Sequence, residues 1–398
     1  MVDTKRKVPN LRFKGFTNDW EQRKLNSFLV EYKKKTKINN QYPVLTSSRQ
    51  GIFFQKDYYD GNQIASKNNV GYNIVPRDYF TYRHMSDDTI FHFNINTLCD
   101  YGIVSTLYPV FTTINQLSSS WLYYYLNYGN DMKRYALLQK QGGSRTYMYF
   151  SKLKNMLAHI PSVKEQDSIA KILLKIDKLI TLQQRKLELL SLIKKKIIKH
   201  LFKLKNSDSL NLKFKTSCSQ WNSKKLGEIA KFINGRAFKQ SELLNKGKYP
   251  VLRVGNFYTN DKWFYSDLNL NKNKYADKGD LLYTWSATFG PHIWKGPKVI
   301  FHYHIWKIDF DPSTVNKTFL FYFLEADKEN LLTNSNGSTM IHITKSNMEN
   351  KIINLPQFSI QQNIGTFLSN LDYLINQEKI KSKQLIQLKR FLLQNMFI

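Results

Sequence analysis

The chain has 398 residues, and its 60 Lys and Arg against 30 Asp and Glu give a formal net charge of +30 at pH 7. This length predicts two to three domains, and a hydrophobic fraction of 42% excludes a wholly disordered chain. The only two cysteines, Cys99 and Cys218, exclude a disulfide framework and a four-cysteine zinc site and fit a reducing cytosol. With no secretory signal and no run of about 18 apolar residues, we expect a cytoplasmic protein without a membrane span. The positive surplus predicts a polyanionic partner.

The first part of the chain is rich in short aromatic and β-branched runs, separated by Gly, Asn and Asp. Such runs are typical of β-strands between turns. A helical stretch is predicted near 118–138. The predicted strands are 42–46, 73–75, 79–82, 90–93 and 106–111.

A long helix is predicted after Pro161, because proline is common just ahead of a helix. From 173 to 201 the apolar residues recur in steps of three and four, with polar interruptions, as in helices that pack along their length. About 40 helical residues would reach about 60 Å, which exceeds one small domain. Two separate helices, each lying on its own domain, are the alternative. The predicted packing residues are Leu173, Ile176, Ile180, Leu187, Leu190 and Ile197.

The second part repeats this organisation. Helical stretches are predicted near 316–331 and after Pro356. The predicted strands are 251–254, 281–285, 298–301 and 305–308. The packing residues of the second long helix are Leu368, Leu371, Ile375, Leu385 and Leu392.

Internal duplication is the most informative feature of the sequence. Residues 157–202 align with 352–397 without a gap, at a constant offset of 195. A second block also recurs in the same order, since Tyr42–Leu45 returns as Tyr249–Leu252. We therefore predict a mixed α/β (α+β) fold with an internal pseudo-two-fold repeat, in which two long antiparallel helices form a coiled coil between two similar domains. The predicted ranges are 1–160, 161–205, 206–355 and 356–398.

Most catalytic signatures are missing. The sequence has no phosphate-binding GxxxxGK[ST] loop, no GxGxxG and no HExxH. His302 and His304 have no third metal ligand nearby in sequence, so we interpret them as polar edges of a strand. Asp87 and Asp88 are interpreted as turn residues. We predict no catalytic residue and no metal ligand in this chain.

The sequence does supply the groups that bind nucleic acid. Basic side chains neutralise phosphates, while Arg, Asn, Gln, Ser and Thr on loops can read base edges. For any one of these residues a structural turn is at least as probable as a base contact, so the prediction rests on the collection. The predicted DNA-contacting residues are Ser47, Ser48, Arg49, Gln50, Tyr82, Arg83, His84, Ser144, Arg145, Tyr147, Arg253, Asn256, Trp285, Ser286, Thr288, Ser338 and Thr339.

Taken together, these features resemble the DNA-specificity subunit of a type I restriction–modification enzyme. The block Pro161-Ser-Val-Lys-Glu-Gln166 is close to the family's helix opening, and Pro356-Gln-Phe-Ser-Ile-Gln361 is a looser copy. Gly279-Asp-Leu-Leu-Tyr283 is similar to the family's Gly-Asp-Leu-Leu strand, and Gly-Ser pairs at 143–144 and 337–338 also fit. The sequence departs from the pattern at Val75-Pro-Arg-Asp78, where the first Gly-Asp pair would stand.

The resemblance implies that each globular half is a target-recognition domain reading one part of a split, asymmetric DNA target. It implies that the paired helices set the spacing and dock the modification subunits, two in number, which methylate adenine. The chain itself would be non-catalytic and would bind no cofactor. S-adenosylmethionine, ATP and magnesium would belong to modification and restriction/translocase partners. The partners implied are double-stranded DNA and these subunits, and no membrane.

Two other readings of the residues stay open. One is a basic protein-interaction scaffold that reads no DNA sequence. The other is an enzyme that acts on nucleic acid through scattered residues. Salt-dependent binding to duplex DNA and activity of the purified chain alone would separate the three.

Overall fold

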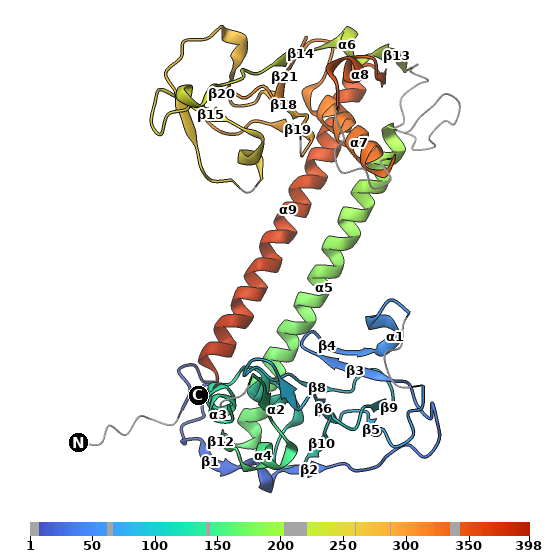
Figure 1. The fold of residues 1–398 in the computed structure, drawn as a ribbon, viewed down its shortest axis with the longest axis vertical. Helices are drawn as coiled ribbons and strands as arrows, with labels where there is room; N and C mark the ends of the chain where they lie inside the picture. The colour runs from blue at the N-terminus through green and yellow to red at the C-terminus, as the bar shows by residue number, and fades with distance from the viewer. Residues whose placement is uncertain are drawn as a thin grey trace, which may run out of the picture. The chain divides into compact units, whose positions relative to one another are not determined.

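The computed structural model describes residues 8–61, 67–140, 144–202, 221–258, 260–286, 288–334 and 343–398. The chain divides into two compact units. Unit 1 comprises Met1–Gln184 and Ile380–Ile398, and unit 2 comprises Arg185–Lys379. Each unit contains one globular segment and one end of each of the two long helices, α5 (Val163–Phe202) and α9 (Phe358–Asn395) (Figure 1).

Unit 1 is built on a four-stranded antiparallel sheet in the order β2-β10-β6-β8. The pairs β1-β12, β3-β4, β5-β9 and β7-β11 surround it. The helix α2 contacts α3 and β8, α3 contacts β12, and α4 contacts the turn at Leu25–Ser27. The elements are β1 (Glu21–Lys24), β2 (Leu29–Glu31), β3 (Leu45–Ser48), β4 (Gly51–Phe54), α1 (Gln55–Tyr58), β5 (Asn73–Pro76), β6 (Phe80–Tyr82), β7 (Met85–Ser86), β8 (Phe93–Ile95), β9 (Tyr101–Val104), β10 (Val110–Thr113), α2 (Ser119–Tyr128), α3 (Asn130–Leu138), β11 (Thr146–Tyr147), α4 (Phe150–Asn155) and β12 (Leu157–Ile160), with a short 3₁₀ turn at Leu25–Ser27.

Unit 2 repeats this plan. Its antiparallel sheet β14-β21-β18-β19 has the same order of equivalent strands, and a second sheet, β16-β15-β20-β17, contains one parallel pair. The pair β13-β22 matches β1-β12 and also precedes a long helix. The elements are β13 (Asn222–Lys225), α6 (Leu226–Ile229), β14 (Ala230–Asn234), β15 (Tyr249–Leu252), η3 (Val254–Phe257), β16 (Phe264–Ser266), β17 (Tyr275–Ala276), β18 (Leu281–Thr284), β19 (Gly290–Ile293), β20 (Val299–Phe301), β21 (Ile305–Phe310), α7 (Lys317–Asn334), α8 (Lys345–Glu349) and β22 (Ile352–Leu355), with short 3₁₀ turns at Gln240–Glu242 and Lys272–Lys274.

The main core of each unit includes the ends of both long helices. In unit 1, Leu173 of α5 and Phe397, just after α9, are buried in one cluster with Trp20 and Trp121. In unit 2, Ile198 of α5 and Leu368 of α9 are buried with the sheet and α7. Burial of large apolar side chains is the main stabilising term. The helices are therefore part of both cores.

The heptad series along the long helices is the least exposed face of each helix. Every position of the series in α5 and α9 is buried or half-buried, and its polar members are Gln183, Lys194, Glu378, Ser382 and Lys389. The predicted packing residues Leu173, Ile176, Leu368, Leu371 and Ile375 are buried, and Ile180, Leu187, Leu190, Ile197, Leu385 and Leu392 are half-buried.

A glutamine fixes the start of each long helix. The Gln166 amide accepts a hydrogen bond from the Ser118 N–H at 2.7 Å and donates to the carbonyl of the proline five residues earlier at 2.9 Å. Gln361 forms the same two bonds, to the Asn316 N–H at 2.9 Å and to its own proline at 2.9 Å. Both glutamines are 1% exposed, and their hydrogen bonds join the start of α5 to the start of α2 and the start of α9 to the start of α7.

A carboxylate in each unit joins the two long helices. In unit 1, Asp177 of α5 accepts from the Tyr124 hydroxyl at 2.7 Å and binds the Lys389 ammonium of α9 at 2.6 Å. The Lys389 nitrogen also lies 6.0 Å from the centre of the Tyr124 ring. Asp177 is near the start of α5 and Lys389 near the end of α9, so the helices pair in antiparallel directions.

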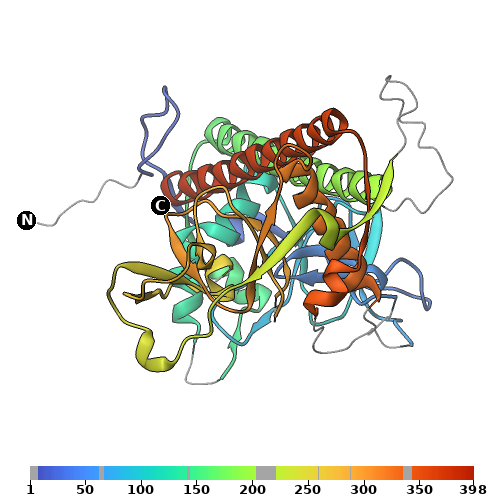
Figure 2. The same cartoon turned by 90° about the horizontal axis from the view of Figure 1, so that it is seen from above.

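Unit 2 has the same three groups with the helices exchanged, since Tyr322 and Asp372 lie 198 and 195 residues after Tyr124 and Asp177, and Lys194 lies 195 residues before Lys389. Asp372 of α9 accepts from the Tyr322 hydroxyl at 2.6 Å and binds Lys194 of α5 at 2.6 Å. A further ion pair, Lys186 to Glu378 at 3.0 Å, also joins the two helices in this unit. In both views the helix segments of each unit lie side by side (Figure 2). The predicted fold class and internal repeat are confirmed.

Several predicted elements differ in their bounds. The helical stretch at 118–138 is two helices, because the chain turns at Gly129, where a Cβ would lie 2.6 Å from the Tyr125 carbonyl oxygen. The predicted strand 90–93 begins only at Phe93, because the Ile90 N–H is bound by the Asp88 side chain in a turn. The strand at 251–254 ends at Leu252 and is followed by the 3₁₀ turn η3.

None of the described helices combines the length and the apolar character needed to cross a bilayer.

Candidate nucleic-acid interface

A cleft of about 720 Å³ in unit 1 gathers side chains from segments that are far apart in the sequence. Its walls come from the β3–β4 hairpin, the β6–β7 connection, the segment before β8 and the loop before β10. The predicted contact residues on its walls are Ser47, Ser48, Arg49, Gln50, Arg83 and His84. The β3–β4 hairpin and the β6–β7 connection, which were predicted as separate contact loops, therefore share one cleft.

The β3–β4 hairpin presents Arg49 and Gln50 at its tip. Pairing of Ser48 with Gly51 leaves only these two residues in the turn, and both are exposed. The Ser48 hydroxyl closes the turn, since it accepts from the Gln50 N–H at 3.1 Å and donates to the Gly51 carbonyl at 3.1 Å. The hydrogen bonds of Ser48 thus fix the turn so that the side chains of Arg49 and Gln50 extend from the hairpin tip.

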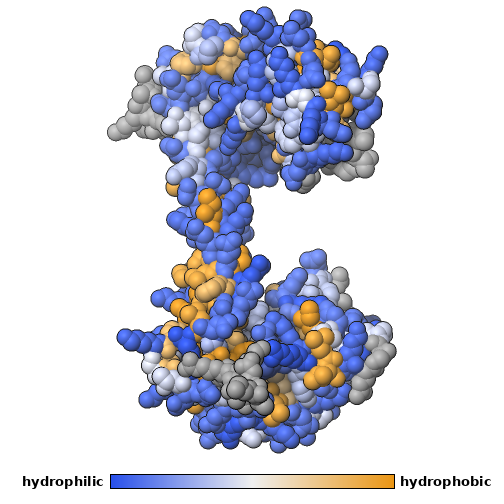
Figure 3. Space-filling model, turned by 90° about the vertical axis from the view of Figure 1, so that its left-hand side faces the viewer, coloured by the Kyte–Doolittle hydropathy of each residue, from blue (hydrophilic) through white to orange (hydrophobic). Residues whose placement is uncertain are grey.

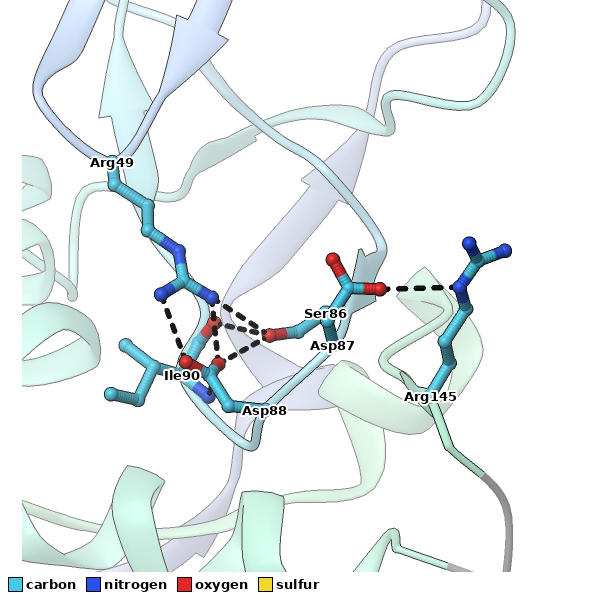
Figure 4. Close-up of polar contacts among 6 residues, drawn as sticks. All are labelled: Arg49, Ser86, Asp87, Asp88, Ile90 and Arg145. Carbon is cyan, nitrogen blue, oxygen red and sulfur yellow. Dashed lines mark hydrogen bonds and ion pairs between the residues drawn. The ribbon is translucent and has the colours of Figure 1, made fainter.

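The two carboxylates after β7 bind arginines from other segments, as Figure 4 shows. Asp88 binds Arg49, and Asp87 binds Arg145. The hydrogen bonds from Arg49 and Ser86 hold the pKa of Asp88 well below its ordinary range, so this carboxylate stays ionised. The sequence interpretation of Asp87 and Asp88 as turn residues missed both ion pairs.

Aromatic rings line the edge of a second basic cleft, of about 660 Å³. The His84 ring stacks on Tyr149 at 5.1 Å, and Tyr149 stacks on Tyr147 at 5.8 Å. Lys33 and Lys35 contribute charge to the walls, as does Lys154 of α4. Stacked rings beside lysines can bind bases and phosphates together. These lysines are not among the predicted contact residues, although Lys33 and Lys35 belong to the basic run YKKKTK at 32–37.

The prediction that Tyr82 contacts DNA is wrong. Its ring is fully buried in β6, and its hydroxyl donates to the Met148 carbonyl at 2.9 Å. Ser47 is also buried at the back of the hairpin, where it donates to the Thr81 carbonyl and accepts from Asn94 at 2.8 Å. Tyr82 supports the cleft from inside the core, whereas Ser47 lies on the cleft wall with its hydroxyl already bonded within the protein. Ser144 and Arg145 are exposed, and Tyr147 is half-buried in β11.

In unit 2, the candidate Asn256 stabilises its own turn. Its side-chain oxygen accepts from the Arg253 N–H at 3.0 Å, and its amide donates to the carbonyls of Asn260 and Lys262. The Arg253 guanidinium lies 5.2 Å from the centre of the Phe264 ring. Asn256 therefore has its polar atoms engaged within the protein, whereas Arg253 is held by a cation–π contact.

Trp285 lies at the end of β18, beside the turn that joins β20 and β21. Its indole N–H donates to the Tyr303 carbonyl at 2.9 Å, and its ring stacks on Trp306 at 5.7 Å. Ser286 and Thr288 lie in the loop between β18 and β19, where Ser286 is half-buried and Thr288 is exposed.

The turn η3 packs against β19. This contact brings the turn that contains Asn256 close to the loop between β18 and β19. The Phe257 ring of η3 stacks on His292 of β19 at 3.9 Å. The candidates Ser338 and Thr339 lie outside the described residues.

Two histidines of unit 2 are neutral at pH 7. Burial, followed by the charge of Lys328, lowers the pKa of His292 to about 4. Burial, followed by His304 and Arg253, lowers the pKa of His302 to about 4. These rings offer aromatic faces rather than positive charge.

His302 directly follows β20 and forms a single bridge with Arg236, whereas His304 lies in the turn that leads into β21, so the two histidines do not lie on one strand as predicted. Among the residues that the structure describes, no group of three or more His, Cys, Asp and Glu side chains could hold a metal ion.

The type I restriction modification DNA specificity domain model matches residues 17–192 and 218–388, one match in each half. The putative type I restriction enzyme MjaX specificity subunit of Methanocaldococcus jannaschii is 25% identical over 287 residues, which cover 69% of this chain and 66% of that protein. The type I restriction enzyme EcoBI specificity subunit of Escherichia coli is 24% identical over 173 residues, which cover 43% of this chain and 36% of that protein. The chain thus spans less than two thirds of each of these relatives.

Two solved structures share the fold along nearly the whole chain. The S subunit of the type I restriction–modification system from M. genitalium matches with a TM-score of 0.58 and 17% identity, over 98% of this chain and 99% of that one. The HsdS subunit from Thermoanaerobacter tengcongensis matches with a TM-score of 0.51 and 15% identity, over 100% of this chain and 99% of that one. Since the family model matches both halves and most of the length, the chain belongs to the type I restriction modification DNA specificity domain family, as the sequence resemblance predicted.

Proposed function

We propose that this chain selects the DNA target of a type I restriction–modification complex and is itself non-catalytic. The observation that carries this proposal is the cleft of unit 1, where arginines and polar side chains from separate loops meet on a chain of net charge +30. Basic groups supply affinity for phosphates, and loop donors and acceptors supply base reading. Unit 2 has the same fold but different loop chemistry. Its half of the target would therefore have a different sequence, which makes the whole target bipartite and asymmetric.

The paired helices would set the distance between the two half-sites. The 40 residues of α5 correspond to about 60 Å of helix. At about 3.4 Å per base pair, such a length matches roughly one to two turns of duplex. The ion pairs between α5 and α9 support a fixed pairing of the helices.

The same helices would dock the modification subunits, two in number. Figure 3 shows apolar side chains gathered over the long helices. Exposed apolar clusters of this kind mark protein-interaction surfaces. S-adenosylmethionine, ATP and magnesium would be bound by the modification and restriction partners. The exposed apolar residues are Val163, Leu174, Leu179, Leu182, Leu189, Leu192 and Ile193 on α5, and Phe367, Tyr373, Leu374, Ile380, Ile386, Leu388 and Phe391 on α9.

Single-molecule sequencing of methylated adenines, in cells with and without this chain, tests the proposal directly. We expect one two-part motif that is methylated only when the chain is present. Methylation or cleavage of DNA by the purified chain alone would contradict the non-catalytic assignment. A scaffold without DNA reading would leave the methylation pattern unchanged and would show no preference among duplexes.

A matched deletion tests the spacing role. The ion pairs Asp177–Lys389 and Lys194–Asp372 set the antiparallel register, in which residues 178–184 of α5 face residues 382–388 of α9. Deleting both heptads would shorten the pair by about 10 Å, or about three base pairs. We expect a spacer shortened by this amount with both half-site sequences retained. An unchanged spacer in a folded variant would exclude this role.

A further inference from the structure

One turn of unit 1 holds two arginines through adjacent carboxylates. Asp88 accepts from the two terminal nitrogens of Arg49 at 2.7 and 2.8 Å, whereas Asp87 accepts from the Nε of Arg145 at 3.1 Å. Arg49 comes from the β3–β4 hairpin tip, and Arg145 precedes β11. The two arginines therefore reach the same turn from different segments.

The register of β7 and β11 explains why Arg145 meets Asp87. Thr146 pairs with Ser86, and Tyr147 pairs with Met85. Continued by one position, this antiparallel register places Arg145 opposite Asp87. Opposite charges directly across a strand pair attract each other. The contact thus follows from the backbone as well as from charge.

The two arginines differ in which guanidinium nitrogens are not already bonded within the protein. The terminal pair of Arg49 is bound to Asp88, and one of these nitrogens also reaches the Ser86 hydroxyl at 3.4 Å. The terminal nitrogens of Arg145 point away from Asp87 (Figure 4) and form no hydrogen bond with the described residues. A guanidinium reads the O6 and N7 of guanine with two parallel N–H donors. Arg145 has such a pair to offer, and Arg49 does not.

The ion pair with Asp88 fixes Arg49 and prevents its terminal nitrogens from contacting a base. Its partner Asp88 is itself fixed by the Ser86 hydroxyl at 2.7 Å and by the Ile90 N–H at 2.9 Å, and Ser86 is buried. Contact with a base through the same nitrogens would break a two-bond ion pair. Arg49 therefore joins the hairpin to the turn.

We propose that Arg145 reads a guanine in the half-site of unit 1, that Asp87 is the positioning residue that orients it, and that Arg49 is a structural clamp. This inference rests on the proposed function. A carboxylate on Nε restricts the plane of the guanidinium before DNA arrives, which lowers the cost of ordering it on the base. The same carboxylate repels phosphates. Asp87 therefore favours the correct base while weakening binding to unrelated DNA.

The experiment measures binding of the full chain with its modification subunits to duplexes that carry the methylated motif. Single base pairs of each half-site are replaced in turn, and an unrelated duplex is included. R145A should abolish the preference at one G·C pair of the unit 1 half-site, by about tenfold or more, and leave the unit 2 half-site unchanged. R145K should lose the same preference, because lysine lacks the paired donors.

D87N should weaken the preference at the same base pair and leave binding to the unrelated duplex equal or stronger. D87E should restore part of the preference. R49K and D88N are the matched controls, and they should lower affinity and thermal stability without altering which base is preferred.

Two results would overturn the inference while leaving the proposed function intact. One is an unchanged preference at every base pair in R145A. The other is D87N weakening all duplexes alike, which would make Asp87 merely structural. Failure of the wild-type complex to prefer any duplex would instead contradict the proposed function itself.

Discussion

Units 1 and 2 agree closely at their junction with the long helices and differ in the loops that reach outward. At the junction, Gln166 and Gln361 form the same hydrogen bonds, and Asp177 and Asp372 bind equivalent tyrosines and lysines. In the loops, unit 1 has arginine–carboxylate pairs. In unit 2, the loop that contains η3 is held by a ring stack between Phe257 and His292 at 3.9 Å, and an ion pair of Arg236 with Glu242 lies in another loop, after β14.

Packing constrains the junctions of the duplicated fold more tightly than it constrains the loops. The junction has to bury helix ends and satisfy buried amides, so few side chains fit it. The loops carry exposed side chains, which can change without loss of the core. A chain with two such units can keep one architecture and carry two unlike sets of exposed loops.

We expect the greatest loss of stability when the phenylalanine at the end of each long helix is replaced by alanine, and we expect this loss to differ between the two units. Phe397 is 3% exposed and packs against Trp121 and Tyr125, whereas its counterpart Phe202 is only half-buried against Phe319 and Phe323. Phe397→Ala should destabilise unit 1 by about 3 kcal/mol, and Phe202→Ala should destabilise unit 2 by less. Hydrogen exchange read separately for peptides of each unit measures both. Equal losses would show that the two ends are packed alike.

A smaller effect distinguishes the units by pH. The pKa of His292 is lowered from 6.5 to about 4 by burial, so the unfolded chain takes up the proton first. Stability of unit 2 is therefore fully present above pH 6.5 and is lost as the pH falls toward 4, by about 1–2 kcal/mol at pH 5. Urea denaturation at pH 7 and pH 5 checks this. In His292→Gln the pH dependence should be smaller, and an identical slope would assign it to other groups.

The smallest effect tests whether the two junctions are equivalent in energy as well as in geometry. Asp177→Asn and Asp372→Asn each weaken a charged hydrogen bond and an ion pair that are about a third exposed. Each should cost its own unit about 1 kcal/mol. A double-mutant cycle with Lys389→Met or Lys194→Met measures the coupling. Unequal coupling energies would mean that the two Asp–Lys pairs have the same geometry but contribute different free energies.

The sequence predicted the features that depend on periodicity and repetition. The gapless match at an offset of 195 identified two equivalent helices, and the structure has them start at Val163 and Phe358, two residues after their prolines. Strand positions were less accurate. Short strands such as β8 are bounded by side-chain contacts like that of Asp88 with the Ile90 N–H, which no local pattern reveals.

The candidate site was predicted only as a set of loops. Arg49 and Asp88 are 39 residues apart, and Arg145 and Asp87 are 58 apart, so their pairing needs the folded sheet. Tyr82 was misassigned because an aromatic residue beside Arg83 is compatible with a binding loop as well as with a buried strand. The pairing of β6 with β10 in the sheet shows that Tyr82 lies in a buried strand and not in an exposed loop.

The glutamine at the start of each long helix also has a mechanical consequence. The amide of Gln166 bonds on one side to the chain entering α5 and on the other to the start of α2, and it is shielded from water. A hinge requires a few residues that can change their backbone angles freely, and this joint has its hydrogen bonds closed within the core. A tilt of the α5 axis would therefore turn the loops of unit 1 by the same angle. This joint would make α5 a rigid lever on those loops.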